Sequence, residues 1–122
     1  MIQVKTANVL AALLKWQYHH KLILLILWTL KRHKRIMVTE GFRPARHADD
    51  LHATKPVRAI DCRSWIYKNP RTIKKDVDDN WLYDPDRPEL SCCKYHNVGL
   101  GWHFHFQVHP KTIFRDGLEK IR

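Results

Sequence analysis

The 122-residue sequence contains few cysteines, and their arrangement argues against two kinds of stabilisation. There are three, Cys62 and the adjacent pair Cys92 and Cys93. An odd number of thiols, two of them neighbours, is a poor basis for a disulfide framework, so we expect reduced cysteines, as in a cytosolic protein. No two cysteines have the CxxC spacing, which excludes a zinc site built from four thiolates.

Long apolar runs are also missing. The longest unbroken run, from Leu22 to Trp28, is far shorter than the roughly 20 residues that span a bilayer. A secretory signal places its charge before the apolar run and a small-residue cleavage site after it, whereas here basic residues follow the run. We therefore predict no transmembrane span and no secretory signal. The segment is predicted to be a buried helix, with an amphipathic helix at a membrane interface as the alternative.

Acidic residues are few, at 12 against 22 Lys and Arg, which gives a formal charge of +10. Such a charge favours anionic partners, namely nucleic acid, an anionic membrane or an anionic wall polymer, and does not choose among them. The sequence contains no recognised nucleic-acid-binding motif, and its basic residues are spread over several regions, so no nucleic-acid partner is expected. The oligomeric state is left open by the sequence.

The apolar residues, at 44% of the chain, are sufficient for one domain with one modest core. Between Ala7 and Lys34 they recur at helical spacing, which predicts one long helix or two short ones divided at His19-His20. Short strands are predicted at Ile36–Thr39 and Pro56–Cys62, and a weak helix or irregular segment at Trp65–Asp76. The expected fold class is α+β, with one or more N-terminal helices packed on a small antiparallel sheet.

The clearest element is a strand predicted from Trp102 to His109, in which apolar residues alternate strictly with histidines and one glutamine. One face of this strand is expected to be core, and the other to carry the histidines. We predict that residues 1–122 form a single domain, with an N-terminal helical region over 1–35 and a core over 36–110 that holds the functional site.

Nine histidines invite a search for a metal site, because neutral imidazole is the commonest metal ligand. His103 and His105 share one face of the last strand, about 7 Å apart, so one ring can be a ligand while the other acts as an acid–base partner. Asp61 follows an apolar strand, where a carboxylate needs a partner, either a metal ion or a neighbouring arginine. Taken singly, each of these residues also fits an ordinary role, on the solvent face of a strand or in a salt bridge.

The order of the motifs along the chain is more specific than any one of them. Val38-Thr39-Glu40-Gly41-Phe42-Arg43 is followed by His52, then by Val57-Arg58-Ala59-Ile60-Asp61, and finally by Trp102-His103-Phe104-His105. This order resembles the zinc D-Ala-D-Ala carboxypeptidases and related wall endopeptidases, which share a fold with the Hedgehog signalling domain. The resemblance extends over residues 36–110.

The resemblance implies a Hedgehog/DD-peptidase-like fold and a zinc peptidase that cleaves short peptidoglycan stem peptides. It implies that Zn²⁺ is held by His52, Asp61 and His105. Arg43 is expected to contact the carbonyl or the terminal carboxylate of the substrate, and His103 to serve as proton shuttle or oxyanion donor. Family habit, the basic charge and the missing signal point to a cytoplasmic or phage-associated protein.

The sequence departs from the family pattern at two points. Eight residues separate His52 from Asp61, where the family has six, so His47 is a competing ligand. The family's carboxylate three residues before the last ligand falls on Trp102, so His103 must take its role. This second departure favours an alternative, a catalytically inactive zinc-binding domain of the same fold. A basic nucleic-acid-binding protein is the other alternative.

Overall fold

The structure, a computed structural model, describes residues 1–97, 99 and 101–115. Its elements, in chain order, are β1 (Ile2–Val4), α1 (Ala7–Lys15), α2 (His20–His33), β2 (Ile36–Glu40), the short 3₁₀ helix η1 (Leu51–Ala53), β3 (Ala59–Arg63), α3 (Pro70–Asn80), β4 (Trp81–Leu82), β5 (Cys93–Asn97), β6 (Trp102–Gln107) and β7 (Ile113–Phe114). The last part of the predicted domain, residues 116–122, lies outside the described residues.

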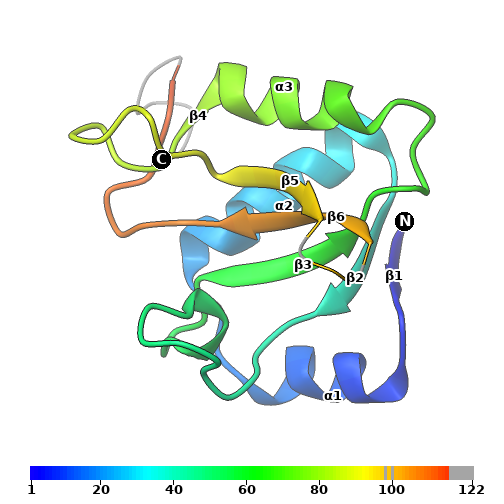
Figure 1. Cartoon of the computed structure of the whole chain (residues 1–122). Coiled ribbons are helices and arrows are strands. Elements are labelled where there is room, and N and C mark those ends of the chain that lie inside the picture. The colour runs from blue at the N-terminus through cyan, green and yellow to red at the C-terminus, as the bar shows by residue number, and fades with distance from the viewer. Residues whose placement is uncertain (98, 100, 116–122) are drawn as a thin grey trace.

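Five strands form one mixed sheet in the order β1-β2-β3-β6-β5, and β4 and β7 form a separate two-stranded sheet (Figure 1). The α+β class is thereby confirmed. The neighbouring pairs β2–β3, β3–β6 and β6–β5 are antiparallel, as predicted. The prediction of an antiparallel sheet is wrong at one edge, where β1 pairs with β2 in parallel. The reason is that two helices lie between these strands and return the chain to the same end of the sheet, the connection that parallel strands require.

The N-terminal helical segment is divided into α1 and α2 at the predicted position, next to His19. Thr6 caps α1 by accepting a hydrogen bond from the Val9 amide at 3.2 Å. The ring of His19 caps α2, where its Nδ1 accepts from the Lys21 amide at 3.1 Å. α2 is terminated by Lys34, the residue after its end, which adopts the left-handed conformation with φ at 71°. Among the described residues, no helix combines the length and the hydrophobicity needed to cross a membrane.

α3 begins later than the segment Trp65–Asp76 suggested. Pro70 occupies its first turn, where the missing N–H of proline is not needed, and a residue that precedes a proline is disfavoured in a helix. Ile73 and Val77, one turn apart, bury the apolar stripe of the helix in the core. The proline therefore fixes the start of the helix, and the residues before it form turns.

The core lies between the helices and one face of the sheet. Phe104 and Phe106 of β6 are buried there in one cluster with Leu22 and Leu25 of α2. In Figure 1, α2 lies behind the sheet and α3 runs beside β5. Because successive side chains of a strand point to opposite faces, His105, between the two phenylalanines, points to the other face. That face is bordered by the loop between β2 and β3, and it holds the candidate site.

Candidate metal centre

Asp61 and His105 are brought together by the pairing of β3 with β6. The register of these antiparallel strands places the two residues directly opposite each other. The Oδ1 of Asp61 lies 3.0 Å from the Nδ1 of His105. Two of the three predicted ligands, distant in the sequence, are thus juxtaposed by the strand register alone.

His52 reaches the same point from η1. Its side chain is 1% exposed, and its Nε2 lies 3.1 Å from Oδ1 of Asp61. Asp50 shapes this turn, because its carboxylate accepts from the amides of His52 at 3.1 Å and of Arg46 at 3.0 Å. Burial alone would raise the pKa of Asp50, but these two hydrogen bonds and the charge of Arg43 lower it. The ionised Asp50 therefore holds the loop in the shape that places His52.

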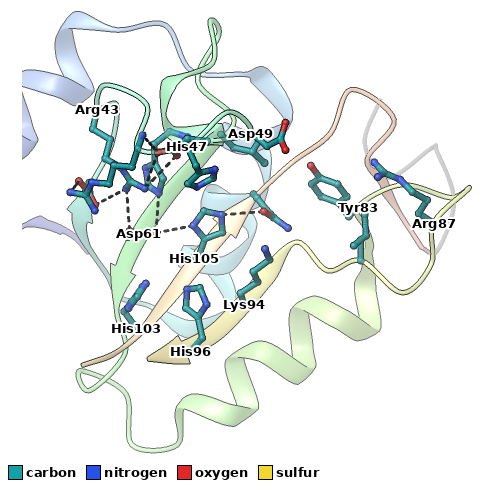
Figure 2. A pocket seen from close by; sticks show the side chains of 17 residues that line it. Arg43, His47, Asp49, Asp61, Tyr83, Arg87, Lys94, His96, His103 and His105 are labelled. Carbon is teal, nitrogen blue, oxygen red and sulfur yellow. Dashed lines mark hydrogen bonds and ion pairs between the residues drawn. The ribbon is translucent and has the colours of Figure 1, made fainter. Parts of the chain in front are cut away.

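The ligand atoms of His52, Asp61 and His105 lie within 4.8 Å of one another. Two imidazoles and one carboxylate are a donor set that can hold a metal ion. Figure 2 shows His105 pointing toward Asp61 on the floor of a cleft. His47, the competing ligand, lines the same cleft, but it does not belong to the ligand cluster that the described part of the chain forms.

The hydrogen-bond partner of His52 fixes which of its ring nitrogens carries the proton. Its Nδ1 lies 2.8 Å from the carbonyl oxygen of Gly41, and a carbonyl oxygen can only accept. Nδ1 therefore carries the hydrogen and donates it to Gly41. In a neutral ring, Nε2 is then an acceptor, and its lone pair faces Oδ1 of Asp61.

The same reasoning applies to His105 on the opposite side of the carboxylate. Gln107 donates through its side-chain Nε2 to the carbonyl of Ser91 at 2.8 Å, which orients its amide. The Oε1 of Gln107 therefore accepts, and it lies 3.1 Å from Nε2 of His105. His105 consequently donates through Nε2, and in the neutral ring its Nδ1 lone pair also faces Asp61.

Two neutral imidazoles would thus direct two lone pairs at one carboxylate oxygen, at 3.1 and 3.0 Å. Such an arrangement requires a cation at its centre, either a metal ion or protons on the rings. Burial would raise the pKa of Asp61, but with protons on both rings the hydrogen bonds from His105 and His52, together with their charges, hold it well below its usual range. The outer ring nitrogens are already bonded to Gly41 and Gln107, as is usual for metal-binding histidines. The residues present therefore fit a metal ion.

Arg43 enters the cleft, but its guanidinium is held by carboxylates. Nη1 lies 2.8 Å from Glu40 and 3.8 Å from Oδ2 of Asp61, and Nη2 lies 3.2 Å from Asp50. The charge is thus beside the Asp61 oxygen that does not face the histidines. Arg46, whose side chain is 59% exposed, shares Glu40 at 3.3 Å and is the freer of the two cations.

His103 lies on the same face of β6 as His105 and outside the ligand cluster. Its Nδ1 lies 3.2 Å from the carbonyl of Gly101, to which it donates. His96, its partner across the β5–β6 pair, has its ring centroid 4.7 Å away, and Figure 2 shows the two rings side by side. Burial lowers the pKa of His96, and the charges of His103 and His105 lower it further. A pair of imidazoles, His96 and His103, therefore adjoins the candidate metal centre.

The cleft has a volume of about 520 Å³. It extends from the histidine pair past the ligand cluster to the side of Tyr83 and Arg87 (Figure 2). Its lining includes four permanently cationic side chains, Arg43, Arg46, Arg87 and Lys94. The same lining holds four carboxylates, Glu40, Asp49, Asp50 and Asp61, so the cleft offers charges of both signs to a ligand.

Two residues of the site, Gln107 and His96, were not anticipated from the sequence. Gln107 had a usable signal, because it lies two residues after His105 and therefore on the same face of a predicted strand. His96 had none, since its place depends on β5, which was not predicted, and on the register of β5 with β6.

Comparison of the chain with protein-family models, with curated proteins and with solved structures found no match. Inference about function therefore depends on the site and on the motif order along the chain.

Proposed function

We propose that this protein is a zinc-dependent peptidase that cleaves short peptidoglycan stem peptides. The observation that carries the proposal is the convergence of His52, Asp61 and His105 on one open face of the sheet. Two imidazoles and a carboxylate are a frequent ligand set of catalytic zinc, which keeps a fourth position for water or substrate. The motif order that resembles the zinc D-Ala-D-Ala carboxypeptidases supports the same metal and the same substrate class.

The residues around the three ligands support a preformed site. Gly41 and Gln107 fix the tautomers of the two histidines, so their inner nitrogens are available as ligands. Arg43 neutralises the outer oxygen of Asp61. When bound, zinc polarises the scissile carbonyl and lowers the pKa of water to about 7. We infer that Arg43 acts mainly by holding Asp61 and the loop, because Glu40 and Asp50 bind its two terminal nitrogens.

His103 is the proposed proton carrier. Its Nδ1 donates to Gly101, which leaves Nε2 as the nitrogen that exchanges a proton in the cleft. In this role His103 accepts the proton of the attacking water and passes it to the leaving amine. The neighbouring His96 has a lowered pKa, so it does not compete for this proton near neutral pH. His103 thus takes the role of the carboxylate that the peptidases resembled by the motif order have at the position of Trp102.

Recognition of the stem peptide is assigned to the exposed cations of the cleft, Arg46, Arg87 and Lys94. Such peptides end in a carboxylate and carry further acidic groups, and guanidinium groups bind carboxylates in bidentate geometry. Arg46 at one end of the cleft and Arg87 and Lys94 on its other side present charges to these groups. A cytoplasmic or phage-associated enzyme is the setting that the resemblance supports.

Metal analysis and a chelation assay test the proposal. Protein purified without added metal is expected to hold about one zinc per chain and to hydrolyse a stem peptide ending in D-Ala-D-Ala. A chelator should abolish hydrolysis, and zinc should restore it. If no divalent metal is found, and zinc does not shift the melting temperature, the metal centre is wrong.

A second candidate function is zinc binding without catalysis, and Trp102 at the position of the family's carboxylate favours it. Stoichiometric zinc with no hydrolysis of any stem peptide would select this function over the peptidase. The zinc measurement and the hydrolysis measurement therefore separate the two.

A further inference from the structure

On the far side of the sheet from the metal centre, an apolar groove opens between β1, α1 and α2. Its volume is about 340 Å³, and its lining is apolar throughout except for one tyrosine: Ile2, Leu13, Trp16, Tyr18, Leu22, Ile23, Ile26, Leu27, Val38 and Ile60. Several of these side chains are largely exposed, among them Leu27 at 50%. α1, which supplies Leu13 to the groove, also exposes Leu14 at 79%. Exposed apolar side chains gathered around a groove are a feature of interaction sites.

Positive charge is concentrated in the same part of the chain. Residues 1–39 contain five lysines and two arginines and no acidic residue, so they carry +7 of the formal charge of +10. The remaining residues are close to balanced. The helices and strands that surround the groove are thus the cationic part of the sequence, although Arg32 is paired with Asp76 and Lys21 donates to the carbonyl of Pro110.

Lysines lie next to two residues of the groove lining. The ammonium groups of Lys15 and Lys55 lie 5.5 and 5.1 Å from the ring of Trp16. The Met1 nitrogen, adjacent to Ile2 in the chain, donates to the carbonyl of Lys34 at 2.6 Å, so the backbone of Lys34 lies close to Ile2. A tryptophan flanked by lysines above an apolar surface is the composition of a membrane–water interface.

We propose that this groove face docks on an anionic phospholipid bilayer. The apolar side chains of α1 and α2 enter the boundary between headgroups and acyl chains, and the lysines contact the phosphates. A second copy of the chain is disfavoured, because pairing this face with itself would bring two cationic surfaces together. Nucleic acid explains the charge but not the exposed leucines and isoleucine, since phosphate contacts need no apolar groove.

The position of the groove leaves the candidate metal centre accessible in the docked state. α2 packs on the core face of the sheet, whereas Asp61 and His105 lie on the opposite face. A molecule bound through α1 and α2 therefore presents its cleft to the aqueous side. The inference goes beyond the proposed peptidase activity and does not depend on it.

Vesicle flotation tests the proposal directly. The full-length protein is mixed with vesicles of phosphatidylcholine alone, or of phosphatidylcholine with phosphatidylglycerol, and the bound fraction is measured. We expect binding only to the vesicles that contain phosphatidylglycerol, and weakening by salt. Ile23→Ser with Leu27→Ser should reduce the affinity at least tenfold. Lys15→Gln with Lys55→Gln should reduce it about thirtyfold, since each cation near an anionic bilayer contributes roughly fivefold.

Matched control variants remove an exposed apolar side chain and two exposed cations outside the groove. Trp65→Ser removes a side chain that is 70% exposed outside the groove, and Lys75→Gln with Lys111→Gln removes two exposed cations. These variants should bind as the original protein does, and the melting temperature of each variant shows that it is folded. The proposal is overturned if the original protein binds no vesicle, or if the controls lose as much affinity as the groove variants. Two results would assign the face to another occupant. If no vesicle is bound and the groove variants abolish a dimer seen in sedimentation, the occupant is a second copy of the chain. If no vesicle is bound and the lysine variants abolish DNA binding, the occupant is nucleic acid.

Discussion

The ring of His52 donates through Nδ1 to the main-chain carbonyl of Gly41, at 2.8 Å. Gly41 follows directly after β2, so this bond ties the buried histidine of η1 to the end of the neighbouring strand. It also decides that Nε2, and not Nδ1, faces Asp61. The tautomer of a candidate metal ligand is thus set by the backbone position of one glycine, and this position is itself constrained by Tyr18.

Gly41→Ala is expected to weaken both the fold and zinc binding. A Cβ at this position would collide with the Tyr18 hydroxyl, which accepts from the Phe42 amide at 3.0 Å. Relief of the collision must shift either the tyrosine or the carbonyl that orients His52. We expect a destabilisation of about 1–3 kcal/mol and about a tenfold loss of zinc affinity, measured by urea unfolding and by competition with a chelator. Tyr18→Phe in the same chain should restore part of both losses, and no restoration would contradict this cause.

His105→Ala should abolish tight zinc binding, whereas His103→Ala should retain zinc and lose turnover. The reason is that His105 belongs to the ligand cluster and His103, on the same strand face, does not. Loss of one of three protein ligands weakens zinc binding by orders of magnitude, and loss of a proton carrier costs about 10²–10⁴ in rate. Zinc content and hydrolysis of a stem peptide measure the two effects. The opposite pattern would show that the two roles are reversed.

His52→Ala is predicted to lose zinc and activity together, while His47→Ala stays near the unmodified protein. His52 is buried with its ring on Asp61, and His47 lies on the exposed wall of the cleft. Elemental analysis of both variants, purified side by side, distinguishes them. A metal-free His47→Ala protein beside a zinc-loaded His52→Ala protein would overturn the ligand assignment.

Gln107→Met tests the support of His105 without touching a ligand. The substitution keeps a similar volume in a buried position but removes the oxygen that accepts from His105 at 3.1 Å. Outer hydrogen-bond partners of metal ligands contribute about 10–100-fold to affinity, so zinc binding should weaken by that factor. Gln17→Met, at an exposed position, is the control. Equal zinc affinities in the two variants would remove Gln107 from the site.

A pH-dependent contribution to stability is expected from Asp76, away from the metal centre. Its carboxylate joins α3 to the end of α2 through Arg32 at 2.7 Å and His33 at 2.8 Å. Burial would raise the pKa of Asp76, but these hydrogen bonds and charges lower it. A lowered folded-state pKa stabilises the fold above the unfolded-state value of about 3.9, and the contribution is lost as the pH falls below it.

Asp76→Asn should therefore destabilise the protein by about 1 kcal/mol at pH 7, a modest value because Arg32 is half exposed. The difference from the unmodified protein should shrink as the pH falls from about 5 to 3, measured by urea unfolding. Asp79→Asn, which breaks the exposed pair with Lys75, should have a smaller effect. A difference that stays constant with pH would mean that the charge of Asp76 is not the cause.

The parts of the fold that could be predicted from the sequence are those with a strong local period. The alternation in β6 and the helical spacing on both sides of His19 depend only on neighbouring residues, and both elements are present. β5 alternates only from Cys93 to His96, and a run of four residues is too short to predict a strand. It is a strand because β6 offers it a hydrogen-bonding edge. β1 likewise becomes a strand only through its parallel pairing with β2.

The candidate site divides in the same way. The ligand types and their order along the chain could be read from the sequence, and the structure brings His52, Asp61 and His105 together. The register that sets Asp61 opposite His105, and the contacts that orient the rings, are non-local and left no trace in the sequence. The ion pair between Arg43 and Asp50 could not be predicted either, because the position of Asp50 is fixed by the turn around it.

The strict alternation of β6 has a consequence for misfolded molecules. Slippage of this strand by one residue against β3 would turn every side chain to the other face. Phe104 and Phe106 would then be exposed to water, and His103 and His105 would be forced into the apolar interior. Such a slipped state loses its core and its ligands at the same step, so it cannot accumulate as a stable, inactive form. A preparation of this protein should accordingly divide into competent molecules and unfolded ones, and the fraction that binds zinc should equal the fraction that is folded.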